Sequence, residues 1–347
     1  MKREQGFSLM EVVVVLALVS GLMIVVYTLI EETLQTAMFN ESHNDLTIMT
    51  QRAVNQVYVE LLQSATAYQD DTAGNEYRAA LQIPATTPVM PNSLLPVFDP
   101  DPALNPDTGT GTARRTGNSL LIVRSLAPLE GTNKPVLYDH DTNNATPEIE
   151  LPIDRYRFEY FFLSRNTSRN FGGAGWYLDL VRAASGEYAD YFQLSTLTPA
   201  QLTRVTNQLL GYGIQRAWHP AQPLGNAFYD LNEAKDGTFN PPLARPTIAI
   251  AESKTMLPEM RGGRISGRMD YSVTFRPTSR PAFPIRHPVF AYAQADAAKP
   301  GFPSGFEVKV AGPIGFRKVF VRLALMSNYR ATNYESQQGV VTTATRF

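Results

Sequence analysis

Oxygen-bearing side chains gather in one short segment of the chain in a pattern that could hold a metal ion. Between residues 139 and 150 they stand at loop positions one, three, five and twelve, as Asp139, Asp141, Asn143 and Glu150. A calcium loop supplies its ligands at this spacing. Asn144 replaces the usual glycine at position six, and Pro147 occupies position nine without flanking helical patterns. A solvated acidic loop is therefore the competing interpretation, and calcium is the only candidate cofactor.

Groups that could catalyse a reaction are sparse elsewhere in the sequence. The four histidines, at positions 43, 140, 219 and 287, form no pair at metal-ligand spacing. The chain has no cysteine, which excludes thiol nucleophiles and cysteine-ligated metals. It also carries no Gly-x-Ser-x-Gly elbow, phosphate-binding glycine loop or dinucleotide fingerprint. We assign no catalytic residue and expect a protein that is not an enzyme.

One ionisable residue, Glu11, stands at the start of a strongly apolar segment. Residues 12–30 contain no charge, and the six residues before Phe7 are polar and include Lys2 and Arg3. About 20 such residues in a helix span the hydrocarbon core of a membrane. The two cations should stay in the cytoplasm, which places everything after residue 30 on the far side. A carboxylate at the entry of such a segment needs a partner, so Glu11 is a candidate functional residue.

The run Gly6-Phe7-Ser8-Leu9-Met10-Glu11, followed by the aliphatic stretch, resembles the class III signal of type IV prepilins and type II secretion pseudopilins. The resemblance implies that a prepilin peptidase cleaves between Gly6 and Phe7 and that the new amine of Phe7 is methylated. It also implies that Glu11 neutralises the Phe7 amine of a neighbouring subunit and so sets the axial register. The expected partners are the peptidase, other minor and major pilins, and the inner-membrane assembly platform. The net charge of -1 points to no nucleic-acid partner.

An apolar stripe at helical spacing extends beyond the membrane segment. It runs through Leu34, Met38, Leu46, Met49, Ala53, Val57, Leu61 and Ala65. We therefore expect one helix from about residue 7 to about residue 66, which follows a leader at 1–6. Residues 7–30 would form its transmembrane or filament-core half, and residues 31–66 its amphipathic half, packed on a globular head.

The remaining residues, 67–347, are expected to form a β-rich head domain. Strand patterns occur at 120–125, 155–163, 176–182, 213–218, 269–275, 306–310, 319–325 and 340–347. Thr198-Pro199-Ala200-Gln201 predicts the start of a short helix that ends at Gly211. Proline-rich stretches at 84–106, 219–246 and 276–303 predict long loops. The expected class is α+β, and the resemblance implies the type IV pilin fold, a long helix packed on an antiparallel sheet.

Three functions remain open from the sequence. The C-terminal pattern of Val-Arg-Leu-x-Leu, a loop, and Thr-x-x-x-Arg-Phe is similar to the larger minor pilins of the PilW kind and to the J-type minor pseudopilins. The first hypothesis is a minor pilin of a type IV pilus, which joins a priming or tip complex that initiates assembly. It would stand in a bacterial inner membrane with a periplasmic head, then at the pilus tip, with roles in adhesion and motility. The alternatives are a minor pseudopilin of a type II secretion system and a membrane-anchored periplasmic enzyme or binding protein.

Overall fold

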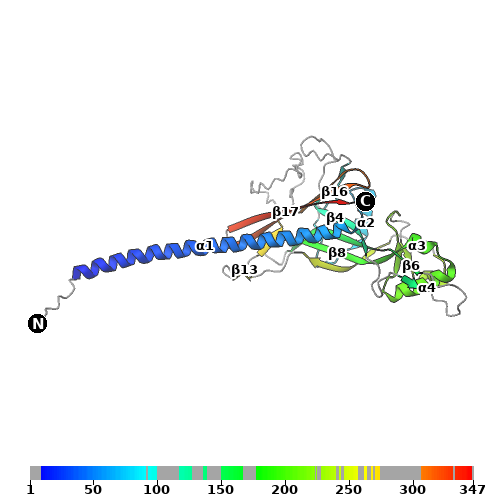
Figure 1. Cartoon of the computed structure of the whole chain (residues 1–347), viewed down its shortest axis with the longest axis horizontal. Helices are drawn as coiled ribbons and strands as arrows, with labels where there is room; N and C mark the ends of the chain where they lie inside the picture. Colours follow the sequence, from blue (N-terminus) through cyan, green and yellow to red (C-terminus); the bar gives the residue numbers. More distant parts are fainter. Residues whose placement is uncertain are drawn as a thin grey trace.

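The computed structural model shows a single long helix whose N-terminal half extends away from a β-rich head (Figure 1). The order of elements confirms the α+β class. The structure describes residues 9–90, 93–99, 117–126, 136–138, 150–166, 177–222, 224, 228–239, 242–243, 246–256, 262–263, 267–268, 270–273, 306–330 and 333–345.

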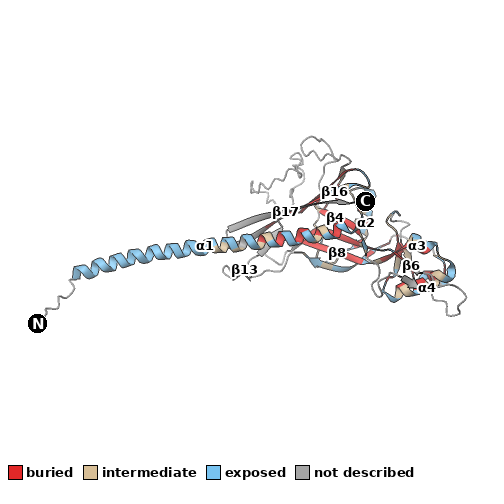
Figure 2. Ribbon diagram, in the orientation of Figure 1, coloured by how far each residue is buried: buried red, intermediate tan, exposed pale blue. Residues whose placement is uncertain are grey.

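Helix α1 spans Leu9–Leu62 without a break, since no proline or interior glycine pair interrupts it. Its first half is exposed, whereas one face of its second half is buried in the head (Figure 2). The buried face carries part of the predicted apolar stripe: Leu46, Met49, Ala53, Val57 and Leu61. The prediction was wrong at the two ends of the stripe. Leu34 is 46% exposed, and Ala65 lies beyond the end of the helix.

The larger sheet lies against one side of α1. Its strands are β1 (Ser64–Ala67), β4 (Ser119–Leu126), β7 (Arg155–Asn166), β8 (Tyr177–Asp190), β11 (Ile248–Thr255) and β2 (Leu81–Gln82), in that spatial order. Strands β9 (Arg216–Trp218) and β10 (Tyr229–Asp230) extend it beside β8. Neighbours are antiparallel except for the pairs β11–β2 and β8–β9. The sheet is therefore mixed, which corrects the expectation of a purely antiparallel head.

The smaller sheet lies on the other side of α1. Strand β16 (Arg317–Arg330) is central and pairs along its whole length with β17 (Asn333–Thr345). Its other edge pairs with β15 (Phe306–Ala311) and then with β14 (Asp270–Val273), and β3 (Phe98–Asp99) adds to β15 in parallel. Two short hairpins stand apart from both sheets: β5 (Val136–Tyr138) with β6 (Glu150–Pro152), and β12 (Gly262–Gly263) with β13 (Gly267–Arg268).

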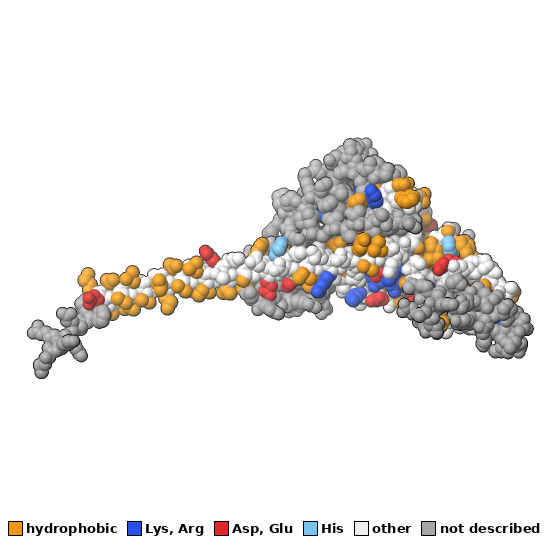
Figure 3. Space-filling view, viewed as in Figure 1, with side chains coloured by type: hydrophobic (Ala, Val, Ile, Leu, Met, Phe, Trp, Pro, Cys, Tyr) orange, Lys and Arg blue, Asp and Glu red, His pale blue; other side chains and the backbone are white. Residues whose placement is uncertain are grey.

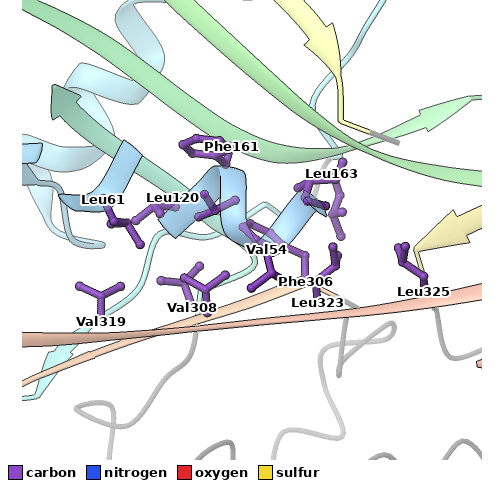
Figure 4. Close-up of a cluster of buried hydrophobic side chains, with 14 of the residues drawn as sticks. Val54, Leu61, Leu120, Phe161, Leu163, Phe306, Val308, Val319, Leu323 and Leu325 are labelled. Atoms are coloured by element: carbon purple, nitrogen blue, oxygen red, sulfur yellow. The ribbon is translucent and has the colours of Figure 1, made fainter. Parts of the chain in front are cut away.

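The main core forms where the two sheets enclose the head half of α1 (Figure 4). Alternate residues of β4 point toward the helix, where Leu120 and Ile122 are fully buried. Leu121 and Val123 point to the opposite face and belong to a second, aromatic core. The larger sheet is therefore buried on both faces, and the helix is an internal element of the head.

The second face of the larger sheet supports a small lobe remote from the N-terminus. Helix α2 (Thr72–Ala80) and the ring of Trp218 pack against the aromatic face of β7. Helices α3 (Tyr191–Ser195) and α4 (Pro199–Gly211), with the 3-10 helix η3 (Glu233–Asp236), enclose a further apolar cluster. Helix α4 confirms the predicted capping box at Thr198 and Gln201.

Two of the predicted proline-rich loops contain structure that proline content did not indicate. In the segment 84–106, Leu95 is fully buried in the aromatic core and β3 pairs with β15. In the segment 219–246, Phe228 and Leu231 are fully buried beside β10 and η3. Proline removes the hydrogen-bond donor of its own nitrogen and restricts the local backbone, but the side chains of neighbouring residues can still enter a core. The third segment, 276–303, lies outside the described residues.

Candidate functional site

The N-terminal half of α1 is an apolar rod without a covering layer in the isolated chain. From Leu9 to Ile30 its large apolar side chains are between 42% and 85% exposed. The space-filling view shows apolar atoms along the whole protruding part (Figure 3). Among the described residues, α1 is the helix long and apolar enough to cross a membrane. Covering these side chains would be worth on the order of tens of kcal/mol, which favours lipid or other helices around the segment.

The length of this rod matches a hydrocarbon layer. The 22 residues from Leu9 to Ile30 rise by about 33 Å in an α-helix, close to the thickness of about 30 Å in a bilayer. The hydroxyl of Thr28 donates to the carbonyl of Val25 at 2.8 Å, which satisfies it without water. Glu31 and Glu32 follow at once and are exposed, so they mark the end of the apolar segment.

Glu11 lies in the first turn of α1, on an exposed part of the helix. A carboxylate at this position interacts favourably with the positive end of the helix dipole. Gly6 and Phe7 lie outside the described residues. Cleavage between them and methylation of Phe7 therefore remain predictions from the sequence.

The candidate calcium ligands are only partly described. Asp139, Asp141 and Asn143 lie outside the described residues, and Glu150 begins β6, where it pairs with Tyr138 of β5. Within the part of the chain that the structure describes, no three histidine, aspartate or glutamate side chains gather as metal ligands do. The calcium site remains a prediction.

A buried charge cluster, which was not predicted from the sequence, connects the last turn of α1 to the larger sheet. Glu159 of β7 is fully buried and accepts hydrogen bonds from Arg182 of β8 at 2.9 and 2.7 Å and from Arg157 at 2.6 Å. Glu60 of α1 lies 3.2 Å from Arg182 and 2.7 Å from Arg124 of β4. Two carboxylates thus share three guanidinium groups at the interface between helix and sheet. The cluster fixes the position of the helix end on the sheet.

Two departures from the usual sequence patterns are the available signal for this cluster. On β7, Arg157 and Glu159 alternate with aromatic residues, and such a pattern usually indicates one solvated face. Glu60 falls between Val57 and Leu61 of the apolar stripe of α1, where a polar residue is unexpected. Both departures have one cause, because α1 covers the polar face of β7 and supplies a charged partner.

Glu60 should make stability depend on pH. Its burial and the nearby Glu159 raise its pKa, against the lowering effect of Arg182, Arg124 and Arg157. A carboxyl with a raised folded-state pKa contributes stability below its unfolded pKa, near 4.5, and loses that contribution as pH rises through the folded pKa. The wild-type chain should therefore gain stability relative to Glu60→Gln as the pH falls from about 7 to about 4.5. Urea unfolding of both proteins in detergent at the two pH values measures this. If the difference in free energy of unfolding between the wild-type chain and Glu60→Gln did not change with pH, the raised pKa of Glu60 would be contradicted.

A second cluster of polar side chains surrounds Asp190, at the base of the small lobe that contains α3 and α4. Asp190 accepts hydrogen bonds from the hydroxyl of Tyr156 at 2.9 Å and from the backbone nitrogen of Gln193 at 2.9 Å. His219 lies 3.6 Å from the same carboxylate, and its ring packs against that of Phe192 at an interplanar angle of 45°, with ring centroids 4.2 Å apart. Asp190 thus caps α3 and holds the lobe to β7. These two hydrogen bonds account for the buried carboxylate of Asp190, so we assign it a structural role.

Comparison with protein families, with curated proteins and with solved structures found no match to this chain.

Proposed function

We propose that this chain is a minor pilin of a type IV pilus, which is processed by a prepilin peptidase and joins a priming or tip complex. Its role is structural and involves no catalysis. The mature subunit is anchored in the inner membrane with its head in the periplasm, and it is then incorporated into the filament with sister pilins. These steps would be driven by the assembly platform in the membrane.

One observation supports an assembling subunit of this kind above a membrane-anchored enzyme or binding protein. A single unbroken helix, α1, is an exposed apolar rod over its first half and an internal element of the head over its second half. A simple membrane anchor would need no rigid connection to the domain that it carries. Because the helix continues into the core, a force or a docking event at the rod is transmitted directly to the head. A subunit that moves from lipid into a helical bundle needs this property, and so does a pseudopilin.

Processing is the first test of the proposal. Mass spectrometry of the mature protein should show Phe7 as the first residue, with one added methyl group on its amine. An intact leader, Met1 to Gly6, in assembled material would rule out the proposed function. Deletion of the gene, scored in parallel for surface pili and for secreted enzymes, then separates the pilus from the secretion system. Loss of pili with normal secretion is the expected result.

Replacing Glu11 with Ala should separate insertion from assembly. Membrane insertion and leader cleavage should remain intact, because removing a charge only eases burial in lipid. Incorporation into filaments should fall by about tenfold or more, since the amine of the neighbouring subunit would then be buried without its counter-charge. Immunoblots of membranes and sheared filaments measure both steps. Glu31→Ala is the matched control, because Glu31 lies at the other end of the apolar segment and is exposed.

A further inference from the structure

The turn between β15 and β16 presents two large apolar side chains to solvent. Ile314 is 83% exposed and Phe316 is 76% exposed, which are the highest values among the described large apolar residues outside α1. The apolar part of α1 is explained by a membrane or a helical bundle. Nothing in the described part of the head accounts for this pair, which has the composition of a binding contact.

The turn is built to hold these side chains outward. Gly312 and Gly315 adopt left-handed φ values of 106° and 84°, which side-chain-bearing residues rarely adopt. A Cβ atom on Gly312 would lie 2.7 Å from the carbonyl oxygen of Phe316, so only glycine fits there. The backbone nitrogen of Phe316 donates to the carbonyl of Pro313 at 3.0 Å and closes the turn. A rigid turn of this kind loses little entropy on binding.

The turn lies past the C-terminal end of α1, on the part of the head that is away from the membrane rod, and the lobe of α3 and α4 extends farther still (Figure 1). In the main core, Leu61 near the end of α1 lies beside Val319, and Val54 lies further along β16 near Leu323 (Figure 4). Strand β16 therefore runs antiparallel to α1, and the residues just before it lie past the C-terminal end of the helix. Thr345 pairs with Arg317, which places the turn beside the last described residues of β17.

The charges around the turn favour a protein partner over a lipid surface. The guanidinium of Arg317 lies 4.7 Å from the ring centre of Phe98 and is directed at the head. Lys318 is then the one exposed cation beside the apolar pair in the described part of this turn. Two apolar side chains and a single lysine fall short of the several signals that stable membrane attachment needs. They match an apolar pocket with an acidic rim.

We propose that Ile314 and Phe316 dock into an apolar, acid-rimmed pocket on the head of the subunit that lies ahead of this one in the assembly, farther from the membrane. This inference rests on the proposed function, because it takes a sister subunit as the occupant. The rigid turn would act as a contact of the head beyond the end of α1, while the apolar half of α1 supplies the contact within the helical bundle.

The test uses the full-length chain in assembling cells, with a photo-crosslinking amino acid at position 316 or, as a control, at Tyr212. Tyr212 is 62% exposed at the end of α4 and belongs to a different part of the head. Position 316 should crosslink to the head of one sister subunit, and position 212 should not crosslink to that surface. Crosslinking of position 316 to lipid, or to no protein in assembled material, would overturn the docking.

A double variant, Ile314→Ser with Phe316→Ser, gives a second readout. Incorporation should fall by about tenfold or more, because losing even one well-buried apolar side chain from a contact is enough for about a tenfold loss of affinity. Thermal unfolding in detergent should stay unchanged, since both side chains are exposed. Normal incorporation of the double variant overturns the docking and leaves the pilin function intact. A wild-type chain that never enters a filament overturns the function itself.

Discussion

Replacing Arg182 with Met should lower the free energy of unfolding of the head by about 3–5 kcal/mol, the usual cost of leaving a buried charge without its partner. Arg182 donates two hydrogen bonds to Glu159, at 2.9 and 2.7 Å, and also lies 3.2 Å from Glu60. Its removal takes the bidentate partner from the fully buried Glu159 and leaves Arg124 and Arg157 as the remaining cations for two carboxylates. Thermal and urea unfolding of the full-length protein in detergent measure the loss.

Two further variants test the reason for this loss. Lys254 pairs with Arg182 across the strands but is exposed, so Lys254→Met should change stability by less than about 0.5 kcal/mol. Adding Glu159→Gln to Arg182→Met should recover part of the loss, because the uncompensated buried charge is then reduced. If the double variant is as unstable as the sum of the two single variants, the cluster does not act as one unit.

The parts of the fold that depend on local pattern were predictable from the sequence. Helix α1 follows from its apolar stripe, and α4 follows from the capping box at Thr198 and Gln201. Strands β4, β7 and β16 follow from short apolar or alternating runs. In each of these elements the residues that fix the structure are neighbours in the sequence, so their spacing alone indicates the element.

The parts that depend on contacts between distant segments were not predictable. Leu95 enters the aromatic core from a proline-rich segment because β4 and α2 leave a site for it, and nothing near Leu95 in sequence specifies that site. The polar face of β7 is buried only because α1 crosses it, about 100 residues away in the chain. The placement of α1 between two sheets likewise requires pairing of β15 and β16 near the other end of the sequence.

The candidate functional residues also include some that were predictable from the sequence and some that were not. Glu11 and the apolar rod were found from the sequence because a membrane segment needs only its own residues to be recognised. The sequence does not reveal that Ile314 and Phe316 are exposed. The same two residues would be buried if the turn folded back onto the head. The glycines at 312 and 315 were the available signal, because a Gly-Pro-x-Gly run predicts a tight turn.

Replacing Val57 with Asp should unfold the head, because α1 is an internal part of its core. Val57 is 1% exposed and packs among apolar residues from both sheets. An aspartate there has to be buried as an unpaired charge or be protonated, and either state costs several kcal/mol. The expected loss exceeds about 4 kcal/mol, which approaches the whole stability of many domains. Resistance to protease and circular dichroism of the full-length protein in detergent measure it.

Val59→Asp is the matched control, with the same substitution two residues further along the same helix. Val59 is 49% exposed, so an aspartate there stays in water and changes stability by about 1 kcal/mol or less. The two variants have the same change in net charge and the same cost in helix propensity, about a few tenths of a kcal/mol. Any difference between them therefore comes from burial against the two sheets. If both variants left the head folded, α1 would be a tether beside the head, and the rigid connection on which the proposed assembly function depends would be absent.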